Sequence, residues 1–153
     1  MDGKKIASGG DDKLLKLYDL ENERELRSIA GHPDWISSIA FSPDGLYLLT
    51  GCGDNIMRLF SVYSGTQIRS FTGHSEYISG VSFSYNGKLV ASSSMDRTVK
   101  IFDVISGEEK YSLPSENEEE IKIDEDVVEI EAFRAVTFSP KGSYLFIGGD
   151  DKI

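Results

Sequence analysis

Residues 31–72 read GHPDWISSIAFSPDGLYLLTGCGDNIMRLFSVYSGTQIRSFT, and residues 73–114 read GHSEYISGVSFSYNGKLVASSSMDRTVKIFDVISGEEKYSLP. Both stretches begin Gly-His and have the same length, so they align without a gap. His32 aligns with His74, Asp54 with Asp96, and Phe60 with Phe102. A fixed period of roughly 40 residues indicates one supersecondary unit that is copied and stacked.

Each copy contains four short apolar segments separated by turn residues. In the first copy we expect strands at residues 36–41, 47–51, 56–62 and 67–72. Turns are expected around Gly45, Asn55 and Gly65, because Gly and Asn tolerate the backbone angles that turns require. The last segment is the most polar, which predicts an exposed outer strand. Short strands with turns at this spacing predict an all-β fold of antiparallel sheets.

The rest of the chain contains incomplete copies of the unit. Residues 1–30 match the second to fourth strands of a copy, without the first strand and its Gly-His. Phe138 lies further along the chain from Phe83 than Phe83 lies from Phe41, so a short segment is inserted before the last copy. We predict one array, made of a partial unit at 1–30, full repeats at 31–72 and 73–114, an acidic insert at 115–132 and a partial unit at 133–153.

The acidic charge is concentrated in one segment. The net charge is −10, and residues 115–131 contain nine acidic residues and one basic residue. We expect this insert to be a solvated loop, with a site for a basic partner as the alternative. The remainder is close to neutral and lacks the basic footprint that binds a phosphate backbone, so no direct nucleic-acid partner is predicted.

The sequence shows no signal for export or membrane insertion. The N-terminus lacks an apolar signal segment, and no apolar run approaches the roughly 18 residues of a membrane span. Cys52 is the single cysteine, so no internal disulfide can form. We expect a soluble intracellular protein, cytoplasmic or nuclear, without a membrane partner.

Several motifs recur at fixed positions in the copies. They are the Gly-His start, a first strand that leads into Phe-Ser and a turn glycine (Phe-Ser-Pro-Asp-Gly in the first copy), an Asp at the second turn, and an aromatic-Asp close such as Phe102-Asp103. In these motifs the chain resembles the WD-repeat family of β-propellers. It departs from the family pattern where Tyr18, Phe60 and Phe102 replace the closing Trp and Ser61 replaces one closing Asp. The resemblance implies a partial propeller of about three four-stranded antiparallel blades, open at both ends.

The resemblance also implies a buried polar tetrad in each blade. By position, the two sets are His32, Thr50, Asp54 and Phe60, and His74, Ser92, Asp96 and Phe102; the partial units keep Ser8, Asp12 and Tyr18 at one end and Asp151 at the other, with Ile147 in place of the hydroxyl. The carboxylate would bond one imidazole nitrogen and the hydroxyl the other, which satisfies each group inside a dry sheet. Because Phe lacks a donor, we expect three bonded members.

An Asp–His–hydroxyl set is also the layout of a nucleophilic hydrolase, and this is the alternative function. A nucleophile must be exposed beside an oxyanion hole, whereas this set recurs in adjacent copies on strands predicted to be buried. Two histidines that lie a full repeat apart and one cysteine do not form a metal site. We therefore predict a non-catalytic protein without a metal or another cofactor.

The family implies a rigid platform for other proteins, which dock on the face that carries the Gly-His loops and second turns. The positions on this face are Pro33, Trp35, Gly53, Ser75, Tyr77, Met95 and Asp11. Trp35, Tyr77 and Met95 are the informative ones, because the strand pattern does not require apolar side chains there and aromatic residues are enriched in binding hot spots. The alternative is that these side chains only cover the core.

Propellers close with about 4–8 blades, so this array would leave sheet faces and edges open. One account is that the chain is a segment of a longer propeller whose further blades complete it. The other is a homodimer that closes one ring of about six blades, in which the C-terminal end supplies the strand missing from residues 1–30.

Overall fold

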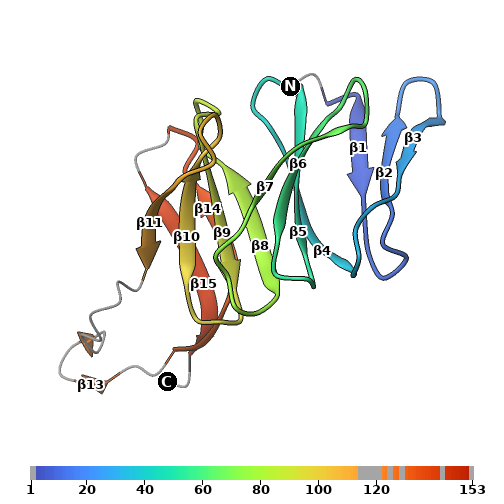
Figure 1. Cartoon of the computed structure of the whole chain (residues 1–153). Coiled ribbons are helices and arrows are strands. Elements are labelled where there is room, and N and C mark those ends of the chain that lie inside the picture. Colours follow the sequence, from blue (N-terminus) through green and yellow to red (C-terminus); the bar gives the residue numbers. More distant parts are fainter. Residues whose placement is uncertain (1–2, 114–121, 124–125, 128–129, 142–143, 152–153) are drawn as a thin grey trace.

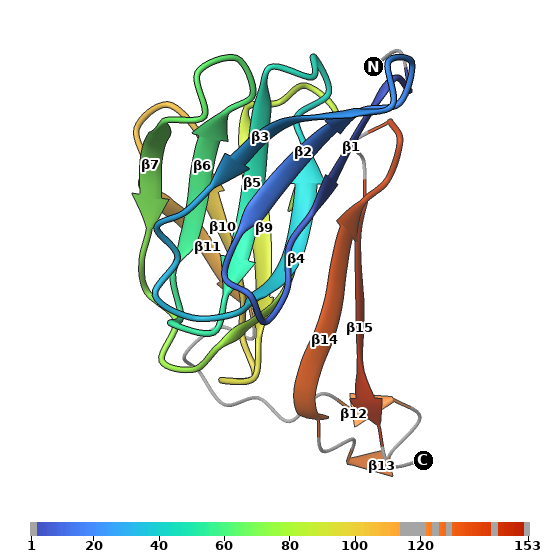
Figure 2. The ribbon, with the colours of Figure 1, turned by 90° about the vertical axis from the view of Figure 1, so that its right-hand side faces the viewer.

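The computed structural model describes residues 3–113, 122–123, 126–127, 130–141 and 144–151, and every regular element in these ranges is a β-strand (Figure 1). The described ranges therefore contain no helix that could cross a membrane. Four antiparallel sheets follow one another in chain order and stack face to face (Figures 1 and 2).

We number these sheets I to IV. Sheet I has the order β1-β2-β3, with β1 (Lys5–Ser8), β2 (Leu15–Asp19) and β3 (Arg24–Ile29). Sheet II contains β4 (Ile36–Phe41), β5 (Tyr47–Cys52), β6 (Met57–Ser61) and β7 (Gln67–Phe71) in that order. Sheet III contains β8 (Ile78–Phe83), β9 (Leu89–Ser94), β10 (Val99–Asp103) and β11 (Glu109–Leu113). Sheet IV pairs β14 (Ile130–Phe138) with β15 (Leu145–Asp151).

The predicted fold class is confirmed. Sheets II and III are four-stranded and antiparallel in the predicted order, and sheet I lacks the strand that corresponds to β4 and β8. The expected solvated loop at 115–132 lies largely outside the described residues. Within it, β12 (Lys122–Ile123) pairs with β13 (Asp126–Val127), and β14 begins at Ile130, slightly before the expected start of the last unit.

Turns alternate between the two ends of each sheet, because the strands are antiparallel. The β4–β5 and β6–β7 turns lie at the upper end of Figure 1, and the β5–β6 turn and the segment that leads into β4 lie at the lower end. We use "upper end" and "lower end" in this sense. The lower end carries the two Gly-His loops.

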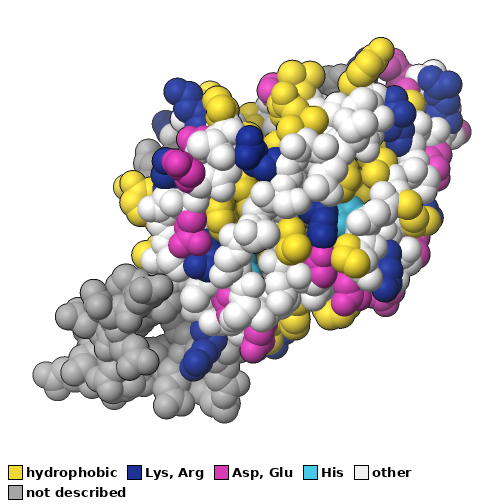
Figure 3. Space-filling model, viewed as in Figure 1, with side chains coloured by type: hydrophobic (Ala, Val, Ile, Leu, Met, Phe, Trp, Pro, Cys, Tyr) yellow, Lys and Arg dark blue, Asp and Glu magenta, His cyan; other side chains and the backbone are white. Residues whose placement is uncertain are grey.

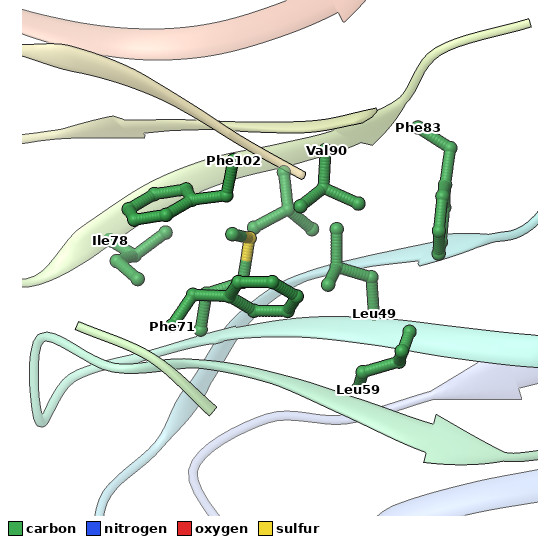
Figure 4. Packing of buried hydrophobic residues seen from close by; sticks show 9 residues of the cluster. Leu49, Leu59, Phe71, Ile78, Phe83, Val90 and Phe102 are labelled. Atoms are coloured by element: carbon green, nitrogen blue, oxygen red, sulfur yellow. The ribbon is translucent and has the colours of Figure 1, made fainter. Parts of the chain in front are cut away.

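Apolar side chains fill the spaces between neighbouring sheets. Side chains alternate along a strand, so sheets II and III each bury one set against the preceding sheet and another against the following sheet. Leu48 belongs to the cluster between sheets I and II, and Leu49 belongs to the cluster between sheets II and III. Figure 4 shows the latter, in which Leu49, Leu59 and Phe71 meet Ile78, Phe83, Val90 and Phe102. A third cluster joins sheets III and IV.

Small residues let the sheets approach closely. A Cβ atom on Gly9 would lie 2.9 Å from the Ile36 side chain, and one on Gly51 would lie 2.6 Å from Ile78 Cγ2. Ile36 and Ile78 both begin the first strand of the following sheet. Glycine at these positions therefore accommodates the isoleucine of the next sheet.

Hydrogen bonds also join each sheet to the next. Ser37 donates its hydroxyl hydrogen to the carbonyl of Ile78, and Ser79 donates to the carbonyl of Phe133 at 2.5 Å. On the outer strands, Arg27 donates to the carbonyl of Tyr63, and Arg69 donates to the carbonyls of Ser106 and Ile105 at 3.0 and 2.6 Å. The two arginines occupy equivalent positions in β3 and β7, so the same tie is used twice.

Candidate functional site

Sheet III contains a buried polar network centred on His74. The His74 Nδ1 atom lies 2.8 Å from Asp96 Oδ2, and Nε2 lies 2.8 Å from Ser92 Oγ. These are the three polar members that the sequence predicts for this blade. Phe102 is also buried, and its ring packs against Phe71 of sheet II.

Thr98 is a fourth polar member, which the sequence analysis missed. Its hydroxyl donates to Asp96 Oδ1 at 2.6 Å and lies 3.1 Å from His74 Nδ1. The backbone N–H of Ser75 also donates to Asp96, at 3.0 Å. Thr98 lies two residues after Asp96, where a short hydroxyl side chain can reach the carboxylate of a turn. This spacing is the sequence signal that could have identified it.

The corresponding network in sheet II is different. The His32 Nε2 atom lies 2.9 Å from Thr50 Oγ1, as predicted, but Nδ1 has no hydrogen-bond partner among the described residues. Asp54 does not bond His32, and the predicted Asp54–His32 bond is therefore wrong. Ile56 occupies the position of Thr98, so the hydroxyl that bridges the carboxylate and the imidazole in sheet III is missing here.

Asp54 is paired with Arg58 instead. Arg58 Nη1 donates to Asp54 Oδ1 at 2.9 Å, and Nη2 donates to Oδ2 at 2.5 Å. The Arg58 side chain is 9% exposed, so its charge requires a carboxylate partner. Asp12 in sheet I has the same arrangement, since Lys16 at the equivalent position lies 3.2 Å away. The sequence signal was Arg58 itself, a charged residue within the apolar strand β6 that can compete with His32 for the Asp54 carboxylate.

Burial governs the titration of both histidines. Burial, together with the charge of Arg58, lowers the pKa of His32 to about 4. Burial also lowers the pKa of His74, although its bond to Asp96 acts in the opposite direction. Burial would raise the pKa of Asp96, but hydrogen bonds from Thr98 and His74 outweigh it and the pKa falls. Both imidazoles are therefore neutral at pH 7.

The network of sheet III is shielded from solvent. The side chains of His74 and Asp96 are 2% and 7% exposed, and Ser92 is completely buried. A substrate could not reach the Ser92 hydroxyl without opening the sheets, so the arrangement holds the lower-end loop against β9 and β10 and does not present a nucleophile. The described residues also bring together no group of His, Cys, Asp and Glu side chains suited to a metal ion.

The other predicted positions lie at the lower end of the sheets. Trp35 and Tyr77 are half-buried, and their rings meet edge to face with centroids 5.5 Å apart. The pair spans sheets II and III, because Trp35 precedes β4 and Tyr77 precedes β8. Pro33, Ser75 and Asp11 are exposed, whereas Met95 and Gly53 are half-buried in the two second turns.

Gly53 has a packing role beneath Trp35. A Cβ atom on Gly53 would lie 2.8 Å from the Trp35 ring, and the N–H of Gly53 donates to the carbonyl of Trp35 at 2.9 Å. At the equivalent place in sheet III, the N–H of Met95 donates to the carbonyl of Tyr77 at 3.2 Å. Trp35 therefore covers Gly53 at the end of sheet II and is only half-buried.

Two segments of the chain, residues 23–61 and 65–103, match the profile of one family, the WD domain, G-beta repeat. Together the segments make up just over half of the chain. The chain belongs to the WD-repeat family. Each matched WD repeat combines the outer strand of one sheet with the first three strands of the next, namely β3 with β4–β6, and β7 with β8–β10. One repeat therefore links two sheets, as the arginine ties also do.

Individual WD-repeat proteins resemble the chain over one repeat length. Nuclear distribution protein PAC1-2 of Postia placenta is 44% identical over 43 residues, which are 28% of this chain and 10% of that protein. Lissencephaly-1 homolog of Heterostelium pallidum is 41% identical over 44 residues, 29% of this chain and 11% of that protein. Nuclear distribution protein PAC1 of Tuber melanosporum is 46% identical over 44 residues, with shares of 29% and 10%. The matches span about a tenth of the length of these relatives.

Proposed function

We propose that this WD-repeat chain is a non-catalytic scaffold that binds other proteins, and that its contact surface is the lower end around Trp35 and Tyr77. The observation that carries the proposal is the aromatic pair itself. Two large rings from different sheets meet at a loop surface, flanked by the exposed Pro33 and Ser75. Aromatic residues at such places are enriched among binding hot spots, since they offer large contact area at low entropic cost.

The relatives support this proposal at the level of the repeat. Their names describe nuclear distribution proteins, and the shared segment is a single repeat of a larger protein. A repeat of this kind provides a rigid frame, and its loops provide the specificity. We extend the scaffold role to this chain, and its partners are to be identified by experiment.

A hydrolase built on Asp96, His74 and Ser92 is the second candidate. It is disfavoured because all three side chains are buried and because Ser92 would need an exposed oxyanion site beside it. The hydrogen bonds from Thr98 and Ser75 to Asp96 also hold the lower-end loop in place and do not act on a substrate.

Affinity capture with matched variants tests the proposal. The wild-type chain, Trp35→Ala, Tyr77→Ala and Tyr85→Ala would each be immobilised and exposed to a lysate of the source cells, and bound proteins compared by quantitative mass spectrometry. Tyr85 is exposed in the β8–β9 turn at the upper end, where hydrophobic side chains line the edge of Figure 3, and serves as the aromatic control. We expect proteins that lose binding to both lower-end variants and keep binding to Tyr85→Ala. An identical set of captured proteins for all four chains would refute the assignment of this surface.

A further inference from the structure

Two arginines at equivalent positions in β3 and β7 leave different amounts of space beside them. Arg69 of β7 lies over Gly107 in the β10–β11 turn, where an added Cβ atom would be 2.6 Å from Arg69 Nη1. Nη1 and Nη2 of Arg69 donate to the carbonyls of Ser106 and Ile105, at 3.0 and 2.6 Å, so both terminal nitrogens are used. The guanidinium therefore occupies the space between β7 and the following turn.

Arg27 of β3 leaves a cavity at the equivalent place. Its Nη2 atom donates to the carbonyl of Tyr63, and the Arg27 atom nearest to a Cβ added at Gly65 is Cδ, at 3.2 Å, and not a guanidinium nitrogen. The neighbouring residue Ile29 is also smaller than Phe71, its counterpart in β7. An open cavity of about 360 Å³ lies between β3 and the β6–β7 turn. We call it the Arg27 cavity, and it is lined by Leu26, Arg27, Ser28, Ile29, Ser64 and Gly65.

The lining of the Arg27 cavity combines one positive charge with an apolar floor. Among the described residues Arg27 has no carboxylate partner, and its Nε and Nη1 atoms make no hydrogen bond. The guanidinium therefore keeps N–H groups for a further acceptor, and it stays charged at all physiological pH values. Leu26 and Ile29 pack against the cluster between sheets I and II, so they supply apolar surface beside the charge.

We propose that the Arg27 cavity binds a small carboxylate with a short apolar body. The carboxylate would accept hydrogen bonds from the guanidinium, since the two groups share a planar geometry. The apolar body would contact Leu26 and Ile29. A volume of about 360 Å³ lies near the lower limit of small-molecule pockets, roughly 300–1,000 Å³, which restricts the ligand to a small acid. This site shares no residue with the proposed scaffold surface around Trp35 and Tyr77, so the two proposals stand independently.

Titration of the isotope-labelled chain with sodium butyrate at constant ionic strength tests the site. We expect saturable changes in the ¹H–¹⁵N NMR signals of the backbone amides that line the cavity. Butyramide has nearly the same shape without the charge and should cause no such change. Inorganic phosphate should bind more weakly than butyrate, because it lacks the apolar body. A wild-type chain without saturable butyrate shifts would overturn the proposal, and equal affinity for phosphate would overturn the role of the apolar floor.

Two variants separate the charge of the cavity from its shape. Arg27→Gln should weaken butyrate binding by roughly tenfold or more, as expected for the loss of a hydrogen bond to a charged group. Ile29→Phe places in β3 the residue that β7 has at this position, and it should fill the cavity and abolish binding. Undiminished butyrate affinity in either variant would contradict the assignment of the site.

Arg69→Gln is the matched control for the loss of an arginine. Both terminal nitrogens of Arg69 are already bonded to the β10–β11 turn, so this variant should bind butyrate as the wild-type chain does. An equal loss of affinity in Arg69→Gln and Arg27→Gln would overturn the proposal, because it would show a general effect of net charge. Urea unfolding of each variant would verify that it remains folded under the conditions of the titration.

Discussion

Arg58 donates hydrogen bonds to both carboxylate oxygens of Asp54, at 2.9 and 2.5 Å, and this pairing leaves the Nδ1 atom of His32 without a partner among the described residues. In the adjacent sheet, Asp96 bonds both His74 and Thr98. The two copies are thus equivalent in backbone but not in the way that they satisfy their buried polar groups. An unsatisfied buried group costs stability, so sheet II can be improved.

Ile56→Thr should be more stable than Ile56→Val. Ile56 occupies the place of Thr98, so a threonine hydroxyl there would bond His32 Nδ1 and Asp54 as Thr98 does in sheet III. We expect the free energy of unfolding of Ile56→Thr to exceed that of Ile56→Val by about 0.5–1.5 kcal/mol, the value of one added hydrogen bond. Urea unfolding of Ile56→Thr and Ile56→Val would measure this, because valine has the shape of threonine without the hydroxyl. Equal stability of the two variants would show that no bond forms.

Asp96→Ala should destabilise the protein by about 1–3 kcal/mol, since it leaves His74 and the N–H of Ser75 without their acceptor. The matched control is Glu76→Ala, an exposed carboxylate in the same loop. Thermal unfolding would compare both variants with the wild-type chain. A melting temperature for Asp96→Ala that equals that of the control would argue against a stabilising role for the network.

Stability should also fall in mild acid. Burial and the charge of Arg58 lower the pKa of His32 to about 4, whereas an unfolded histidine titrates near its ordinary value of 6.5. Between these two pH values the unfolded chain binds more protons, so the free energy of unfolding falls as the pH is lowered through this window. His74, whose pKa is also lowered by burial, acts in the same direction.

His32→Gln isolates the contribution of His32. It removes the titrating group, and we expect the loss of stability between pH 6.5 and pH 4 to shrink by roughly 2–3 kcal/mol relative to the wild-type chain. Urea unfolding in steps of pH would provide both curves. Parallel curves for the two proteins would mean that His32 is accessible to protons in the folded state.

Gly51→Ala should lower stability by about 1–3 kcal/mol, because its new methyl group would lie 2.6 Å from the Ile78 side chain and would push the sheets apart. Gly148→Ala is the matched control, since the nearest atom to a Cβ there is 3.9 Å away. The midpoint of urea unfolding should therefore fall only for Gly51→Ala. If both variants unfold at the same urea concentration, the close approach at Gly51 does not limit the packing.

The repeat made most of the fold predictable. Because two copies align without a gap, turns around Gly45 and Gly87 fix the strand ends, and the observed strands of sheet II lie close to the expected ranges. The polar composition of residues 67–72 also predicted the exposed outer strand β7, whose residues are mostly exposed. These features depend on local residue types, which a single sequence displays.

The polar contacts were less predictable, because they depend on competition between side chains. Asp54 and Asp96 occupy the same register, yet Asp54 pairs with Arg58, while Lys100 at the equivalent position in sheet III pairs with Glu109. Position alone predicts which groups are close enough to interact. It does not predict which donor a carboxylate selects, since that depends on the charge and reach of every neighbour.

The hydrogen bonds from Arg27 and Arg69 to the turns of the following sheets couple the stability of each sheet to that of the next. Neighbouring sheets are coupled as in a one-dimensional lattice, so sheet II, which is tied to both sheet I and sheet III, should open least readily. Tyr111 occupies the third arginine position, in β11, and supplies no guanidinium for a further tie. Amide hydrogen exchange should therefore be slowest in β5, β6 and β9, which are inner strands of the tied sheets II and III. It should be faster in β1 and β15, each of which pairs with one strand alone among the described residues.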